Sequence, residues 1–304
     1  MSWHWFLDGW IVVTGMLCAM SAALLGNFLV LRRMSLLGDG ISHAVLPGLA
    51  VAFLLTGSRA SWPMFVGAMI LGVLTAAATQ WIRRVGNVDE GASLGIVFTT
   101  LFALGLVAIE HTAHRVDLDP GCVLFGSIEL TPLDTVRCGG VLVPQAALVL
   151  GGCLLVNGLF VGLFFRPLKI SVFDAAMARS QGIPVGFLHY GLMILVSVTA
   201  VASFESVGSV LVVAMMICPA AAAWILAKRL GGMIAWSLVL GGVCAMVGHF
   251  LAIALPSYWG ISSVSTAGMM SLVAGCAVAL AAMFGPKSRV WRWGSRWTNK
   301  GHSG

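Results

Sequence analysis

Long apolar runs recur along this chain at the length that a helix needs to cross a lipid bilayer. A transmembrane helix covers a hydrocarbon core of about 30 Å with about 20 apolar residues. Nine runs fit that window: 11–31, 35–56, 62–82, 92–109, 139–165, 186–203, 207–227, 233–255 and 264–284. The sixth and seventh are close together and are also compatible with a re-entrant pair, which leaves eight spans as the alternative. We therefore predict an all-α polytopic membrane protein with a single transmembrane domain over residues 1–304.

The low content of charged residues excludes a water-exposed globule of this size. Hydrophobic residues make up 59% of the 304 residues and charged residues only 9%. Soluble domains carry about 25% charged residues, because their surfaces must stay hydrated. Lipid is the solvent that suits this composition. The 37 glycines agree with it, because small residues let helices approach closely in lipid.

The basic residues predict the orientation of the chain, because cytoplasmic loops retain positive charge. With the N-terminus outside, only Arg59, Arg115 and Arg137 of the 17 lysines and arginines fall on the outer side. We expect the other fourteen, and with them the C-terminus, to be cytoplasmic. The basic, tryptophan-containing tail 286–304 then suits anionic lipid headgroups, and no nucleic acid is expected as a partner.

Asp39 and His43 are the ionisable residues that most need a reason to be inside a span. Their i, i+4 spacing places both side chains on one helix face. Counted as continuous helix at about 1.5 Å per residue, they lie roughly 10–15 Å inward from Arg33, near the middle of the bilayer. A carboxylate and an imidazole form a ligand set suited to zinc, manganese or ferrous iron. The alternative is structural: the two side chains pair with each other, or cap a broken helix beside nearby glycines and a proline.

Two further ionisable residues are candidates for the same path. Glu205 lies at the outer end of a span or at a re-entrant tip, where it is either a second carboxylate for the ion or an anion at a helix N-terminus. His249 lies in the outer half of the eighth predicted span. A single histidine there is either a metal ligand or a hydrogen-bonded packing residue.

One cytoplasmic loop, about residues 166–185, is expected to have structure of its own. Ser171 is a plausible N-cap, and a short helix then ends at Gly182 before Pro184. Phe173 and Met177 give this helix an apolar side. Such a helix fits a protein docking site or, alternatively, an interfacial helix against lipid.

The chain contains no motif for catalysis or nucleotide hydrolysis. It lacks a Gly-x-x-x-x-Gly-Lys-Ser/Thr loop, a Gly-x-Ser-x-Gly elbow and a His-Glu-x-x-His helix. We therefore expect a non-catalytic subunit, without a permanently bound cofactor. An active transporter built from it must take its energy from a separate protein.

The sequence resembles a known family. Val30-Leu-Arg-Arg-Met-Ser-Leu-Leu-Gly-Asp, followed by Ser42-His-Ala-Val-Leu-Pro-Gly, resembles the signature of permeases of bacterial ABC importers for zinc, manganese and iron. Stretches that begin at Ala92, Asp174 and Glu205 resemble the family's fourth helix, coupling helix and following pore-side helix. The resemblance covers about residues 10–285. Gly40 and the alanines 220–223 depart from the family, which often has alanine and a threonine at these places.

The resemblance implies a type II ABC importer-like permease in a bacterial inner membrane. Such permeases form dimers, receive the metal ion from an extracytoplasmic binding protein, and are driven by cytoplasmic ABC ATPase subunits. Asp39 and His43 would then be path ligands, and Asp174, Ala176 and Gly182 would belong to the ATPase-coupling helix. The motif does not distinguish a homodimer from a heterodimer with a similar permease.

Two other function classes remain compatible with the residues alone. A proton- or sodium-coupled secondary transporter would use Asp39 and His43 as a proton relay. A structural or assembly membrane protein would use the same pair only to hold helices together. Copurification with a nucleotide-binding subunit is expected of the importer alone.

Overall fold

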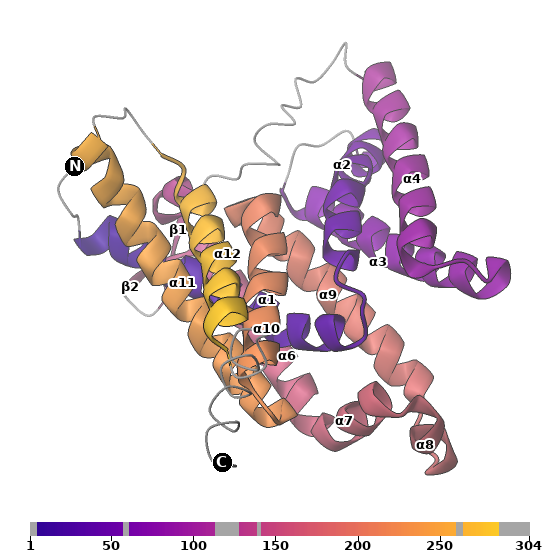
Figure 1. Cartoon of the computed structure of the whole chain (residues 1–304). Coiled ribbons are helices and arrows are strands. Elements are labelled where there is room, and N and C mark those ends of the chain that lie inside the picture. The colour runs from indigo at the N-terminus through magenta and orange to yellow at the C-terminus, as the bar shows by residue number, and fades with distance from the viewer. Residues whose placement is uncertain (1–4, 57–60, 113–127, 139–140, 260–263, 286–304) are drawn as a thin grey trace, which may run out of the picture.

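The computed structural model describes residues 5–56, 61–112, 128–138, 141–259 and 264–285. It is a helical assembly with one small β-hairpin (Figure 1). The elements are α1 (Trp5–Leu31), α2 (Leu37–Thr56), α3 (Ser61–Gly86), α4 (Glu90–Thr112), η1 (Ile128–Leu133), β1 (Thr135–Cys138), β2 (Val141–Pro144), α6 (Gln145–Leu163), α7 (Phe165–Phe173), α8 (Ala175–Ser180), α9 (Val185–Val207), α10 (Ser209–Leu226), α11 (Leu230–Trp259) and α12 (Thr266–Phe284).

Eight of the nine predicted apolar runs fall mainly on helices, and the fifth does so only from Gln145 onward. Within the described ranges, seven helices are long and apolar enough to cross a membrane: α1, α3, α6, α9, α10, α11 and α12. A shorter apolar stretch in α4 runs from Gly91 to Val107. A total of eight or nine spans stays a prediction. The close pair of runs becomes α9 and α10, which are separated only by Gly208 at φ 88° and ψ 158°, a conformation that requires glycine.

The fifth predicted span is wrong at its N-terminal end. It was expected to begin at residue 139, but Val141–Pro144 forms β2, which pairs antiparallel with β1, and α6 begins only at Gln145. A short apolar run fits a strand as well as a helix. Pro144 also disfavours helical backbone at the residue before it. The prediction of an all-α protein therefore needs one correction, which is the addition of the β1–β2 hairpin.

The helices form two packed groups that share α9. In one group α1 packs against α6, α10 and α11, and α12 packs against α10 and α11. In the other, α2 packs against α3 and α4. Contacts of α9 with α1, α2, α3 and α6 join the groups, and α2, α3 and α4 lie together to one side in Figure 1. The α2 segment with the candidate site thus lies outside the main bundle and beside α4.

Small residues and buried amides set the closest helix contacts. A Cβ added to Gly48 of α2 would lie 2.7 Å from the Ala68 Cα of α3. Asn157 Nδ2 donates to Ser21 Oγ and to Thr199 Oγ1, both at 2.9 Å, and so ties α6 to α1 and α9. Close backbone approach and side-chain hydrogen bonds are the contacts that hold helices together in lipid.

Candidate functional site

Asp39 and His43 lie on one face of α2, as their spacing predicts. His43 Nε2 and Asp39 Oδ1 are 3.9 Å apart, which is beyond hydrogen-bonding distance. The Asp39 side chain is 56% exposed and that of His43 is 35% exposed within one protomer. The two groups are therefore not locked to each other, and both are accessible from outside the protomer.

Aromatic rings of α4 hold the His43 imidazole in place. Its ring centroid lies 5.1 Å from that of Phe98 and 6.0 Å, edge to face, from that of Phe102. A Cβ on Gly40 would lie 2.5 Å from Leu94 Cδ1. Glycine at position 40, where the family often has alanine, thus lets α4 approach α2 closely beside the site.

The helix is interrupted after Leu31, which removes the basis for the expected depth of Asp39. Arg33 and Met34 donate to the carbonyls of Val30 and Leu29, which closes α1. Arg33 has φ 60°, and α2 begins only at Leu37. Asp39 lies in the first turn of α2, where the helix dipole favours a carboxylate. The rise counted from Arg33 as continuous helix therefore does not apply. From Leu37 to Thr56 the helix continues through Pro47, so the pair does not cap a break within it.

His249 belongs to a different place in the fold. It is buried in α11, and its Nε2 lies 3.4 Å from Oδ1 of Asp8 in the first turn of α1. Its partner is thus a carboxylate of α1, in a part of the chain where we predicted no site residue. The helices that α11 packs against most closely are α1, α10 and α12.

Glu205 lies in the last turn of α9, three residues before Gly208. It is thus at the C-terminal end of α9 and four residues before α10 begins at Ser209, so both alternatives for its carboxylate stay predictions. The side chain of Glu205 is not among those described. The basic tail 286–304 also lies outside the described residues.

The expected coupling loop forms two short helices. Asp174, not Ser171, is the N-cap: its Oδ1 accepts from Met177 N at 2.9 Å and opens α8. Gly182 ends the segment as predicted, with φ 73°, since Gly182 and Ile183 donate back to carbonyls of α8.

The surface of this segment is exposed and partly apolar. Phe173 is 65% exposed and Met177 is 53% exposed, and Ala176 beside them is exposed as well. Apolar side chains that project from a helix end in this way are available to a partner or to lipid.

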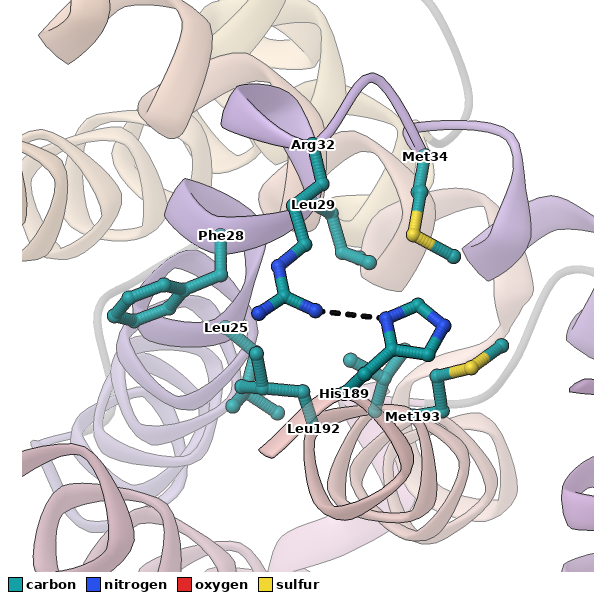
Figure 2. A pocket seen from close by; sticks show the side chains of 9 residues that line it. Leu25, Phe28, Leu29, Arg32, Met34, His189, Leu192 and Met193 are labelled. Carbon is teal, nitrogen blue, oxygen red and sulfur yellow. Dashed lines mark hydrogen bonds between the residues drawn. The ribbon is translucent and has the colours of Figure 1, made fainter. Parts of the chain in front are cut away.

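A polar cluster around Arg32 was not predicted. Arg32 Nη1 lies 2.7 Å from His189 Nδ1 of α9, and Nη2 donates to Ser171 Oγ of α7 at 3.2 Å. Figure 2 shows the guanidinium directed at the imidazole, with Leu25 and Leu192 beside it. From the sequence, Arg32 was one of the cytoplasmic positive charges and a residue of the family motif, and Ser171 was a plausible cap.

The protonation states in this cluster follow from the geometry. A guanidinium is donor-only, so His189 must accept through Nδ1 and is neutral. Burial lowers the pKa of Arg32, but an arginine keeps its proton in proteins. The enclosed cavity beside the pair is about 10 Å³, which is room for about one water molecule. Arg32 thus connects the end of α1 to both α7 and α9.

Comparison with known proteins agrees with the resemblance found in the sequence. The family model described as the ABC 3 transport family matches residues 7–285. The chain is 42% identical to the manganese transport system membrane protein MntD of Bacillus subtilis, over 93% of this chain and 94% of that protein. It is 38% identical to the zinc transport system membrane protein TroD of Treponema pallidum, over 93% of this chain and 75% of that protein.

A solved structure shares the fold over nearly the whole chain. The structure of PsaBC from Streptococcus pneumoniae in complex with Fab matches with a TM-score of 0.75 and 30% identity, and the match covers 94% of both chains. The family model extends over α2, which carries Asp39 and His43, and over α7 and α8. The chain therefore belongs to the ABC 3 transport family.

Proposed function

We propose that this chain is the membrane-spanning permease subunit of an ATP-driven importer of a divalent transition-metal ion, manganese, zinc or iron. Relatives over nearly its whole length are named as manganese and zinc transport membrane proteins. The chain has no nucleotide-binding loop of its own, so the ATPase must be a separate subunit. The fourteen basic residues on one side favour an inner-membrane orientation with the N-terminus outside and the C-terminus in the cytoplasm.

The Asp39–His43 pair carries this proposal. The two groups are 3.9 Å apart, are not hydrogen-bonded to each other, and are open to the outside of the protomer. Together they offer one carboxylate and one imidazole, which are two ligand residues and too few for a closed metal cage. A second pair from a partner protomer, identical or similar, would complete a site that still releases its ion. Glu205 and His249 stay further candidate metal ligands, and the Asp8 carboxylate lies beside His249.

The coupling segment supplies a route from the ATPase to this site. The exposed side of α8, with Asp174 as its N-cap, Ala176 on its surface and Gly182 at its end, is the proposed docking surface for the ATPase. Movement of α7 would reach the α1–α2 connection through the Ser171–Arg32 hydrogen bond. An extracytoplasmic metal-binding protein would deliver the ion from the other side.

Metal uptake into proteoliposomes tests the proposal. The permease and its ATPase are reconstituted, and uptake of radioactive Mn²⁺ or Zn²⁺ is measured with and without ATP. We expect Asp39→Asn and His43→Gln each to lower ATP-dependent uptake more than about tenfold, because each removes a ligand. Basal ATP hydrolysis should persist in both variants. Unchanged uptake in both would overturn the ligand assignment, and uptake driven by a pH or sodium gradient without ATP would identify a secondary transporter.

A further inference from the structure

A basic cavity lies between the α1–α2 connection, the end of α3 and the start of α4. Its volume is about 370 Å³, within the range of about 300–1,000 Å³ that is typical of small-molecule pockets. Arg32, Arg33, Arg83 and Asp89 supply the charged part of its described lining. It lies on the side of the membrane that we propose to be cytoplasmic.

The charge of this cavity favours an anion. Its described lining holds three guanidiniums and one carboxylate, so two positive charges are in excess. Asp89 is partly engaged, because its Oδ2 accepts from Gly91 N at 3.1 Å in the first turn of α4. That turn brings the positive end of the α4 dipole to the cavity wall, where Gly91 lies. A divalent cation would be repelled here, which makes the cavity distinct from the proposed metal path.

Arg33 occupies a position where its backbone conformation favours glycine. Its φ of 60° lies in the left-handed region. The guanidinium has no hydrogen bond or ion pair with any other described residue. Among the described residues, no partner therefore requires an arginine side chain at this position. A ligand that needs the guanidinium accounts for both the charge and the tolerated strain.

The cavity combines this basic wall with apolar surface. Leu36 lines it and is 59% exposed. Guanidinium groups bind phosphate oxygens through paired hydrogen bonds, and basic pockets between helices on the cytoplasmic side bind lipid headgroups. We propose that the cavity binds a phosphate group, supplied by the headgroup of an anionic phospholipid or by a free phosphate ion. The exposed Leu36 beside the guanidiniums favours the lipid, whose acyl chains need apolar surface.

Native mass spectrometry of the purified full chain tests this proposal with phosphatidylglycerol and, as the neutral counterpart, phosphatidylcholine. We expect selective retention of phosphatidylglycerol, lowered about fivefold by Arg33→Gly and by Arg83→Gln, since each removes one cation. Asp89→Asn should increase retention, because asparagine still caps α4 while the carboxylate is lost. Glycine suits the φ of residue 33, so Arg33→Gly should remain folded. Its thermal unfolding midpoint checks this.

Arg84→Gln is the matched control. Arg84 is the neighbour of Arg83 on α3, but it lies over the Tyr190 ring, 5.6 Å from the centroid, and not among the described residues that line the cavity. Its loss should leave lipid retention unchanged. Equal retention of the two lipids by the wild type, or equal retention of phosphatidylglycerol by wild type and Arg33→Gly, would overturn the proposal.

Two further arms identify the source of the anion. If millimolar inorganic phosphate displaces phosphatidylglycerol from the wild type, free phosphate is a ligand of the site. If phosphate leaves the lipid bound, the headgroup is the ligand. Weaker copurification of the ATPase with Arg33→Gly, at unchanged lipid retention, would instead assign the basic wall to a protein contact and refute the phosphate site.

Discussion

The Arg32–His189 contact should contribute measurably to stability, because it connects two helices far apart in the sequence. The two nitrogens are 2.7 Å apart across a separation of 157 residues. A hydrogen bond to a charged group contributes about 1.5–3 kcal/mol. Arg32 also lines the open basic cavity, so water screens it and the lower end of that range, about 1.5 kcal/mol, is the better estimate. Spread over a chain of this size, the loss corresponds to a drop of about 2 °C in the midpoint of thermal unfolding.

A double-mutant cycle isolates this contribution from general packing effects. His189→Leu removes the acceptor, Arg32→Met removes the guanidinium and keeps an unbranched apolar stem, and the double variant removes both. Midpoints are read from tryptophan fluorescence of the purified chain. We expect the double variant to lose about 1.5 kcal/mol less than the sum of the single losses. His189→Gln, which retains an acceptor, should recover part of the loss. Strictly additive losses would refute the pairing.

Three further changes probe α8 and the helix contacts. Asp174→Ala should destabilise α8 by about 1 kcal/mol and speed its amide exchange, whereas Asp174→Asn retains the cap; identical exchange in both would exclude capping. Gly48→Leu should prevent folding to a monodisperse species on size exclusion, because its side chain meets the Ala68 backbone. Gly158→Leu, where an added Cβ meets nothing within 4 Å, is its control. Asn157→Leu loses two hydrogen bonds at about 0.6 kcal/mol each, and an unchanged unfolding midpoint would contradict their role.

The membrane architecture could be predicted because it depends on segment length and hydropathy. Lipid requires that every span satisfy its backbone hydrogen bonds internally, so a sufficiently long apolar run becomes a helix. Eight of the nine predicted runs, and the fifth from Gln145 onward, lie mainly on helices for this reason. The β1–β2 hairpin was missed because Val141–Pro144 is apolar but too short for length to distinguish a strand from a helix.

The candidate site could be predicted only where its contacts are local. Asp39 and His43 share a face because they are four residues apart on one helix, and Gly182 ends its helix because glycine adopts a positive φ at little cost. The Asp8 carboxylate beside His249 comes from the opposite end of the chain. Such a contact depends on how the helices pack, and no local pattern in one sequence encodes it.

The turns at Arg33 and Gly182 have the same geometry, but only the turn at residue 182 could be predicted from its residue type. Both residues close a helix in the same way: each donates to the carbonyl three residues back, the following residue donates to the carbonyl five back, and φ is positive. At position 182 the glycine predicts from the sequence alone that the helix ends there. At position 33 an arginine makes the same turn at an extra cost of roughly 1–2 kcal/mol, and arginine is a good helix former, so the helix was expected to continue. The count of helical rise from Arg33 to Asp39 fails because of that turn, and the depth of Asp39 in the membrane stays a prediction. The same residue then presents a guanidinium to the basic cavity, so the position where local propensity fails is also the one where a ligand best explains the side chain.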